Sequence, residues 1–422
     1  MIKFIYRIIF FILLPFGILG FLLIPRGRKY LKERLGFWGL ETSQAIVWFH
    51  GSSLGELRGI LPILLEIKKN YPELKSLVTT TTQSGREFLE GKCDFPRMLP
   101  LDIGIFYAHA ISNINVKILI VSETEIWPAL LWFVKERNIK SVLINGRISD
   151  SSWPTYKRFR WFFRDLLSSF ERICAADQIS KERFLDLGFN ANQIILTGNS
   201  KYDFDPIVKD TLLRKKLKES FFSTNQLIVS LGSLRPGEES IWFPAIKEIL
   251  AKFNGRIGVI IAPRHPEKFQ FFAEALNSYQ MPFTKWSKIQ DLLDKKNQII
   301  LLDTLGELEK CYSFSDLAFI GGSIGNYGGH NPLEAAAYGV ALCMGPSIFS
   351  VREIVKELKA NSGLLDVNNV EQAKSVLRKL LEEPTEIIKI GQQSKIVFES
   401  FKGAKDKVLK VLNPMLEGHK SD

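Results

Sequence analysis

The fold is decided by residues 316–337, DLAFIGGSIGNYGGHNPLEAAA. Residues 316–320 are a short apolar run that predicts a buried strand leading into a glycine loop. In the predicted helix after this loop, Asn331 suits the N-cap, Pro332 suits the first helical position, and Glu334 completes a capping-box spacing. Strand, glycine loop and helix start form a common phosphate-binding arrangement, in which backbone N–H groups and the helix dipole face the ligand. The same residues also suit a purely structural helix cap, so this motif leaves both interpretations open.

Alternating strand and helix patterns extend outward from this motif. Two series of strand candidates are separated by a polar segment, 203–225, that suits a linker. The first series is 45–49, 76–80, 117–122, 141–145, 172–176 and 193–197, and the second is 227–231, 257–262, 298–302, 317–320 and 341–344. This alternation predicts two doubly wound, Rossmann-like α/β domains with a cleft between them and ligands at the carboxyl ends of the strands.

Composition limits the class of partner. Of the 422 residues, 46% are hydrophobic and 24% charged, as in an ordinary globular protein. The net charge of +11 favours an acidic partner such as a nucleotide, an anionic lipid or a membrane surface, and no nucleic acid is expected. The four cysteines and five histidines show no metal-ligand spacing, so no metal site and a reducing compartment are predicted.

The amino terminus differs in kind from the rest. Residues 8–24 carry no charge, and basic residues flank them on both sides, including Arg26. We expect a membrane anchor over residues 1–27, either a single span or a monotopic interfacial helix. By the positive-inside rule, the following domains, 28–205 and 206–422, lie on the cytoplasmic side of the membrane. The last helix is expected to pack back on the first of these two domains.

Polar residues follow several strands of the first domain. Glu56 begins a predicted helix after strand 45–49, where the dipole favours a carboxylate, and it is a candidate general base. An ordinary first-turn glutamate is the alternative. Glu123 and Glu125 follow strand 117–122 and suit the positioning of a substrate or a cation. Lys201, after strand 193–197, is placed to reach a phosphate.

Three further patterns have two interpretations each. Arg264, after strand 257–262, suits the binding of a phosphate. Asp203 and Asp205 form a D-x-D pair, which in some sugar transferases holds a cation, although three residues are a weak match. Residues 153–172 mix aromatic and basic side chains, which predicts a helix that either contacts anionic lipid or packs on the core.

Taken together, these segments resemble the 3-deoxy-D-manno-oct-2-ulosonic acid (Kdo) transferases of lipopolysaccharide assembly. The resemblance rests on HGSSLGE at 50, TTTQSG at 80, SETEIWP at 122, INGRISD at 144, GNSKYD at 198, APRHPEKF at 262, DTLGEL at 303 and GGHNPLEAAAYG at 328. It implies a GT-B glycosyltransferase with two Rossmann-like domains. It also implies CMP-Kdo as donor and the tetra-acylated lipid A precursor (lipid IVA) as acceptor, used at the cytoplasmic face of the inner membrane.

The resemblance also assigns residues. It places the general base on Glu56 and assistance to the transition state on Glu123 and Lys201. The CMP contacts fall on Pro263, Arg264, Leu305, Gly306, Glu307, Asn331, Pro332, Leu333 and Glu334. The chain departs from the family pattern at Gly51 and Ser200, and residues 232–239 lack a histidine that often precedes the Gly-Glu-Glu there.

The expected activity is inverting transfer of Kdo onto the lipid A precursor. The alternative keeps the fold but changes the donor, as in a UDP-sugar transferase or a sugar-nucleotide epimerase. A non-catalytic membrane-bound scaffold is the third hypothesis, and the joint presence of Glu56, Arg264 and Glu334 argues against it.

Overall fold

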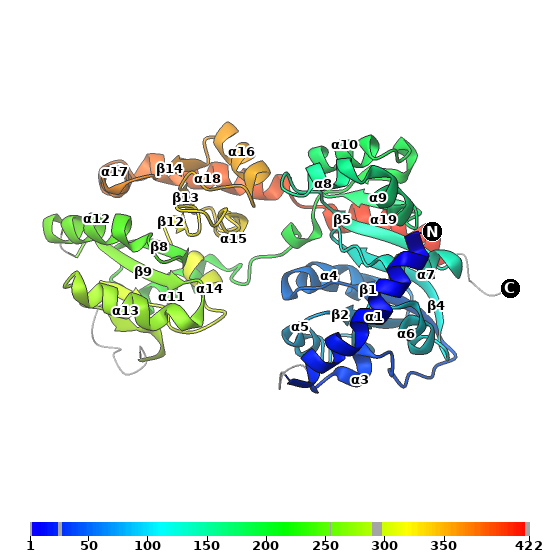
Figure 1. Cartoon of the computed structure of the whole chain (residues 1–422). Coiled ribbons are helices and arrows are strands. Elements are labelled where there is room, and N and C mark those ends of the chain that lie inside the picture. The colour runs from blue at the N-terminus through cyan, green and yellow to red at the C-terminus, as the bar shows by residue number, and fades with distance from the viewer. Residues whose placement is uncertain (1, 24–27, 254, 289–297, 418–422) are drawn as a thin grey trace. The chain divides into compact units, whose positions relative to one another are not determined.

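The computed structural model describes residues 2–23, 28–253, 255–288 and 298–417 (Figure 1). The chain divides into two compact units: unit 1 is Met1–Phe204 with Phe401–Asp422, and unit 2 is Asp205–Ser400. In the described residues each unit contains one seven-stranded sheet, and every strand pair is parallel. The prediction of two parallel-sheet α/β domains is therefore confirmed. Ile24 and Arg26, which the predicted anchor and its flank include, lie outside the described residues.

The sheet of unit 1 has the order β3-β2-β1-β4-β5-β6-β7, with β1 and β4 at its centre. The strands are β1 (Ala45–His50), β2 (Lys75–Thr80), β3 (Phe95–Met98), β4 (Asn115–Ser122), β5 (Lys140–Gly146), β6 (Arg172–Ala175) and β7 (Ile194–Leu196). Along β1, Trp48 packs into one hydrophobic cluster while Val47 and Phe49 pack into another. Because successive side chains of a strand point to opposite faces, both faces of this sheet are buried.

Helices cover both faces of this sheet. They are α1 (Ile2–Leu23), α3 (Leu31–Arg34), α4 (Leu54–Asn70), α5 (Gln83–Phe88), α6 (Gly104–Ala110), α7 (Pro128–Glu136), α8 (Trp153–Arg158), α9 (Arg160–Leu167), α10 (Gln178–Asp186) and α19 (Ala404–Glu417), with short 3₁₀ turns η1 (Ala191–Gln193) and η2 (Ser200–Tyr202). The carboxyl-terminal helix α19 belongs to unit 1, where Val408 and Leu412 pack beside α4.

Unit 2 repeats the arrangement with the order β10-β11-β9-β8-β12-β13-β14. Its strands are β8 (Leu227–Leu234), β9 (Ile257–Pro263), β10 (Thr284–Lys285), β11 (Ile299–Leu301), β12 (Leu317–Ile320), β13 (Ala341–Met344) and β14 (Leu364–Asp366). Its helices are α11 (Thr211–Phe221), α12 (Glu239–Lys252), η3 (Pro266–Lys268), α13 (Phe269–Ser278), α14 (Leu308–Tyr312), α15 (Leu333–Ala336), α16 (Arg352–Ala360), α17 (Val370–Glu382) and α18 (Pro384–Ser400). The first strands of each unit thus lie centrally, as in doubly wound folds.

Two predicted segments differ in the structure. Residues 153–172 do not form one helix, because the backbone leaves the helical conformation at Phe159 (φ −107°, ψ 36°), and the last of them, Arg172, already begins β6. The polar segment 203–225 is only partly a linker, because it contains α11, whose Phe221 ring packs against Phe314 in unit 2.

Helix α1 coincides with most of the predicted anchor and packs along unit 1. The Tyr6 hydroxyl donates a hydrogen bond to Asp102 at 2.6 Å, and Lys3 pairs with Glu136 at 3.4 Å. The opposite side of the helix carries exposed apolar side chains, among them Ile12 and Phe16. None of the helices in the described ranges combines the length and apolar character needed to cross a membrane.

Candidate active site

Glu56 lies in the first turn of α4, directly after the carboxyl end of β1. The N-cap is Ser53, whose hydroxyl accepts the Glu56 N–H at 3.3 Å and donates to Glu56 Oε1 at 2.7 Å. The backbone N–H of Ser52 donates to Oε2 at 2.7 Å. These reciprocal bonds are a variant of the capping box, and they fix the carboxyl group.

Burial controls the charge of Glu56. The residue is only 5% exposed, and this desolvation raises its pKa above that of an ordinary glutamate. The hydrogen bonds from Ser53 and Ser52 lower the pKa, while the negative charges of Glu123 and Glu125 raise it. We expected the helix N-terminus to favour the charged carboxylate and thus a lower pKa for Glu56. Desolvation has the larger effect, and the pKa is raised. A raised pKa brings the carboxyl group closer to the range in which a general base works best at neutral pH.

Glu123 and Lys201 form an ion pair beside Glu56. Glu123 follows β4 and has a left-handed backbone (φ 58°), a conformation that costs energy for a residue with a side chain. Lys201 lies in η2, where the Asn199 side chain accepts its N–H at 3.0 Å. Glu56, Glu123 and Lys201 come from three separate segments, and the structure brings all three together.

A buried polar network holds η2 against α4. Ser200 donates from its hydroxyl to the Gly59 carbonyl at 2.9 Å, and its N–H donates to the Asn145 side chain at 2.8 Å. A Cβ at Gly59 would lie 2.9 Å from Cγ of Lys201, so the close approach requires glycine. Sequence reasoning noted Ser200 only as a departure from the family pattern and missed Asn145 and Gly59. Nothing local in the sequence links residues 59, 145 and 200.

His50, at the end of β1, is a second feature that the sequence did not single out. Its Nδ1 lies 3.0 Å from Oγ1 of Thr79, and its Nε2 has no hydrogen-bond partner among the described residues. Burial lowers the pKa of His50 to about 4, so the ring is neutral at pH 7. Trp127 packs edge-on against it at 6.3 Å between ring centroids.

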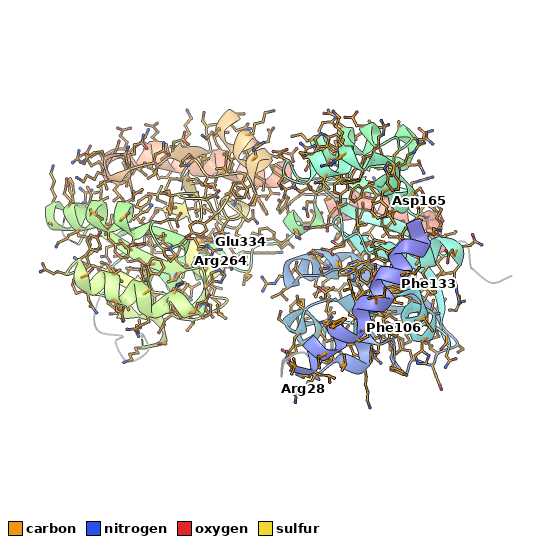
Figure 2. The ribbon with its side chains drawn as sticks, viewed as in Figure 1. Arg28, Phe106, Phe133, Asp165, Arg264 and Glu334 are labelled. Carbon is orange, nitrogen blue, oxygen red and sulfur yellow. The ribbon has the colours of Figure 1, made fainter. Side chains whose placement is uncertain are left out.

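The residues predicted to bind CMP all lie at the carboxyl edge of the unit 2 sheet. Pro263 ends β9 and Arg264 follows it, residues 305–307 connect β11 to α14, and residues 331–334 follow β12. Figure 2 labels Arg264 and Glu334 in unit 2. In the middle segment, Gly306 has a positive φ of 86°, and Glu307 pairs with Lys310 at 2.8 Å. Leu305 is exposed.

The glycine loop after β12 does not present its amide groups in the predicted way. The buried carboxyl group of Glu238 accepts the N–H groups of Gly322 (3.0 Å), Ser323 (3.1 Å) and Ile324 (3.1 Å). It also accepts the N–H of Arg235 at 2.8 Å. An acidic side chain of the chain itself therefore occupies the N–H groups of residues 322–324. The sequence did not reveal this, because Glu238 lies 84 residues before Gly322.

Helix α15 is short. It comprises only Leu333–Ala336, and its N-cap position is Pro332 rather than Asn331. Asn331 still caps locally, since its side chain accepts the N–H of Leu333 at 3.1 Å. The chain turns at Gly339, whose φ of 74° is incompatible with a continuing helix. With one turn the helix dipole is small, so cationic side chains must supply most of the attraction for a phosphate.

Cationic groups do gather here. Arg235 donates from Nε to Nε2 of His330 at 3.3 Å, and its guanidinium lies 5.0 Å over the ring of Tyr327. Burial, followed by the charges of Arg264 and Arg235, lowers the pKa of His330 to about 4. Arg235 and His330 were not predicted as site residues. The sequence signal was present, since Arg235 follows β8 as Arg264 follows β9.

The two aspartates of the D-x-D pair, Asp203 and Asp205, make contacts with other residues of the protein. The Asp203 carboxylate accepts the N–H groups of Gly403 at 2.6 Å and of Lys405, which secures the chain before α19. Asp205 pairs with Lys209 at 2.8 Å. Within the described ranges, no cluster of three or more His, Cys, Asp or Glu residues could hold a metal ion.

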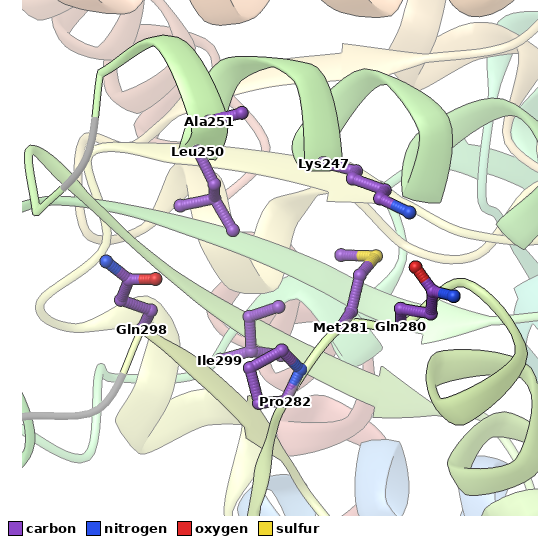
Figure 3. A pocket seen from close by; sticks show the side chains of 8 residues that line it. All are labelled: Lys247, Leu250, Ala251, Gln280, Met281, Pro282, Gln298 and Ile299. Carbon is purple, nitrogen blue, oxygen red and sulfur yellow. The ribbon is translucent and has the colours of Figure 1, made fainter.

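A cavity of about 300 Å³ lies elsewhere in unit 2 (Figure 3). It is lined by Lys247 and Leu250 of α12, by Met281 and Pro282, and by Gln298 next to β11. Since Gln298 precedes β11, this cavity lies at the amino edge of the sheet, away from Arg264 and residues 331–334. Ligands of doubly wound sheets bind at the carboxyl edge, so the cavity is not the expected nucleotide site.

Comparisons with known sequences point to one family. A family model described as 3-Deoxy-D-manno-octulosonic-acid transferase (kdotransferase) matches residues 29–204. The chain is 32% identical to a 3-deoxy-D-manno-octulosonic acid transferase from Haemophilus influenzae, over 93% of each chain. A protein of the same description from Chlamydophila psittaci is 31% identical, over 85% of this chain and 83% of that one.

Comparisons with solved structures describe the fold. A UDP-GlcNAc 2-epimerase from Neisseria meningitidis, bound to UDP-GlcNAc, has a TM-score of 0.61 and 16% identity, covering 88% of this chain and all of its own. A glycosyltransferase from Rickettsia africae has a TM-score of 0.58 and 14% identity, covering 90% of this chain and all of its own. The chain therefore shares its fold with a UDP-GlcNAc 2-epimerase and with a glycosyltransferase.

Proposed function

This chain belongs to the 3-deoxy-D-manno-octulosonic acid (Kdo) transferase family, and we propose that it moves Kdo from CMP-Kdo to the tetra-acylated lipid A precursor (lipid IVA), with Glu56 as the general base. The observation that carries the proposal is the cluster of Glu56, Glu123 and Lys201 at the carboxyl edge of the unit 1 sheet. A buried carboxyl group with a raised pKa, beside an ion pair, is typical of catalytic sites.

Glu56 takes the proton of the attacking acceptor hydroxyl. The hydroxyl oxygen then forms a bond to the anomeric carbon of Kdo while the bond from that carbon to the CMP phosphate oxygen breaks. Attack comes from the face opposite CMP, so the configuration inverts. General-base assistance contributes about 10² to 10⁴ in rate. The bonds from Ser53 and Ser52 hold the carboxyl group in one orientation for this step.

Lys201 and Glu123 assist the transition state. The Lys201 ammonium group lies near the first turn of α4, since a Cβ at Gly55 would be 3.9 Å from its Nζ. This position suits a cation that offsets negative charge as it develops on the sugar carboxylate or the departing phosphate. Glu123 orients Lys201 through the ion pair.

Unit 2 binds the donor. Arg264, together with Arg235 beside His330, supplies cations for the phosphate of CMP. Glu334 accepts hydrogen bonds from the ribose hydroxyls, while Pro263, Leu305, Gly306, Glu307, Asn331, Pro332 and Leu333 shape the remainder of the CMP site. Because charge and hydrogen bonding suffice for these tasks, we propose that no metal takes part, and a chelator should leave the rate unchanged.

The acceptor is a membrane lipid, and we propose that α1 places the enzyme at the cytoplasmic face of the inner membrane as a monotopic helix. Contacts of Tyr6 and Lys3 hold one side of α1 on unit 1, and its other side exposes Ile12, Phe16 and Leu23. A helix with one side packed on the protein and an apolar side exposed is suited to lie in the interface of an anionic membrane. Replacing Phe16 by Glu should weaken flotation of the protein with vesicles containing phosphatidylglycerol.

A different nucleotide sugar is the alternative, favoured by the fold shared with UDP-GlcNAc 2-epimerases. The decisive experiment incubates purified protein with CMP-Kdo and lipid IVA and measures the lipid products by mass spectrometry. We expect products heavier by one or more Kdo residues. Unchanged lipid, together with tighter binding of UDP than of CMP, would replace this proposal by the alternative.

A further inference from the structure

Unit 1 contains a cavity of about 320 Å³ that opens beside α1. Its walls include Phe10 and Leu14 of α1, Leu99 and Leu101 after β3, and Trp127 before α7. We propose that this cavity binds one fatty acyl chain of the acceptor lipid. The inference rests on the proposed function and adds to it a binding site for the apolar part of the acceptor.

The lining suits an alkyl chain rather than a polar ligand. Asp102 reaches the cavity wall, but its carboxyl group already accepts the hydroxyls of Tyr6 (2.6 Å) and Tyr107 (2.9 Å) and the N–H groups of Ala129 and Leu130 (3.0 Å each). Arg34 donates to the carbonyl of Thr81 at 2.7 Å. Since both charged side chains are engaged by the protein, the remaining surface is mainly hydrocarbon, which favours a ligand without hydrogen-bonding groups.

The cavity lies next to the loops that carry the proposed base. Thr81 lines it, and the Thr81 hydroxyl donates to the carbonyl of Ser52 at 3.3 Å. The N–H of Ser52 in turn donates to Glu56. On another wall, Trp127 packs against His50, which begins the loop leading to Glu56. A chain held in the cavity would therefore keep its headgroup close to Glu56.

The cavity is also continuous with the apolar outer side of α1. Leu13 lines the cavity and is nevertheless 53% exposed, so it belongs to both surfaces. The neighbouring Ile12 and Phe16 are exposed on the outer side. If a lipid leaflet contacts the outer side of α1, an acyl chain can pass from the leaflet into the cavity along apolar surface alone. This path avoids the free-energy cost of exposing the acyl chain to water.

The test compares two acceptors and two matched variants. The acceptors are lipid IVA and its fully deacylated disaccharide, and the ratio of their kcat/KM values measures acyl recognition. Leu14→Trp fills the cavity, whereas Leu19→Trp adds the same ring to the same helix at an exposed position outside the cavity. We expect the ratio to fall ~10-fold in Leu14→Trp and to stay unchanged in Leu19→Trp. Leu101→Trp fills the cavity from a wall that α1 does not form. It should lower the ratio to a similar extent, so the test holds even if Leu14→Trp weakens the packing of α1.

Photocross-linking identifies the occupant directly. Lipid IVA with a diazirine in one acyl chain should label Phe10 or Leu99, and Leu101→Trp should abolish this labelling. Equal labelling by phosphatidylethanolamine that carries the same diazirine-bearing acyl chain would overturn the inference. A ratio of kcat/KM values for the two acceptors that is near one in the unaltered protein would also overturn it. Either result leaves the proposed function standing if Kdo is still transferred. Absence of transfer to both acceptors would instead refute the proposed function.

Discussion

The carboxyl group of Glu238 accepts a hydrogen bond from the backbone N–H of Gly322 at 3.0 Å. The same group accepts three further backbone N–H groups, those of Arg235, Ser323 and Ile324. A buried acid thus holds together the glycine loop after β12 and the loop after β8, both at the edge where we propose that CMP binds. Glu238 is therefore a positioning residue for the donor site.

Glu238→Gln should destabilise the protein. The amide nitrogen of glutamine donates rather than accepts, so at least one buried N–H group loses its partner, which costs about 1–3 kcal/mol. Urea unfolding should show a lower midpoint. The matched control is Glu371→Gln, an exposed glutamate of α17 whose surface pair with Lys374 contributes little. An unchanged midpoint in Glu238→Gln would contradict the structural role.

The same residue makes stability depend on pH. Burial raises the pKa of Glu238 to about 7, and its backbone hydrogen bonds act in the opposite direction. An unfolded glutamate has a pKa of about 4.3, so between this value and about 7 the folded state binds more protons than the unfolded state. The free energy of unfolding should therefore fall as pH rises through this window. Denaturation at a series of pH values should show a smaller fall in Glu238→Gln than in the unaltered protein.

Glu56→Gln should remove catalysis without removing donor binding. Glutamine retains the size of the side chain but cannot take a proton, so kcat should fall by about 10²- to 10⁴-fold. Calorimetric titration should give an unchanged affinity for CMP, because we assign that site to unit 2. Near-normal turnover by this variant would exclude Glu56 as the base.

The acid limb of the pH–rate profile should reflect the environment of Glu56. Burial and the charges of Glu123 and Glu125 raise its pKa, so kcat/KM should begin to fall at a pH above about 4.3 as the solution is acidified. Glu125→Gln removes one negative charge and should move this limb to lower pH. A limb that stays in place would show that another group controls it.

Lys201→Met should lower kcat/KM by about 10²-fold, the loss of one electrostatic contact to the transition state. The control, Lys209→Met, removes a lysine whose pair with Asp205 is exposed, and its rate should be normal. The double variant Lys201→Met with Glu123→Gln should lose less activity than the product of the single losses, because the two residues act as a pair. Fully multiplicative losses would refute the coupling.

Most of the fold was predictable because it rests on local patterns. The central strands are continuous apolar runs buried on both faces, and these runs stand out in the sequence. The strands that were missed, β3, β10 and β14, lie at or near sheet edges. β3 contains Pro96, which a central strand would exclude, and β10 has only two residues.

The candidate site was predictable in its members but not in its contacts. Glu56 was predicted because it follows a strand candidate at the start of a helix, and the structure places it in the first turn of α4. Arg235 and His330 were missed as site residues, although His330 lies within the GGHNPLEAAAYG motif at 328 and Arg235 within residues 232–239, because neither the spacing nor the resemblance assigned them a role. The roles of these residues remain predictions until the variants above are measured.

The sequence by itself determined the parallel α/β architecture, the strand ends that carry polar residues and the family, since each depends on short segments read in order. Only the tertiary structure decided that Lys201 pairs with Glu123, that Ser200 binds Asn145 and that Glu238 fills the glycine loop. These contacts join residues 55 to 86 positions apart. The physical reason is that hydrogen bonds and ion pairs depend on distance in space. In a doubly wound sheet the crossover connections determine these distances, and they leave no local signal in the sequence.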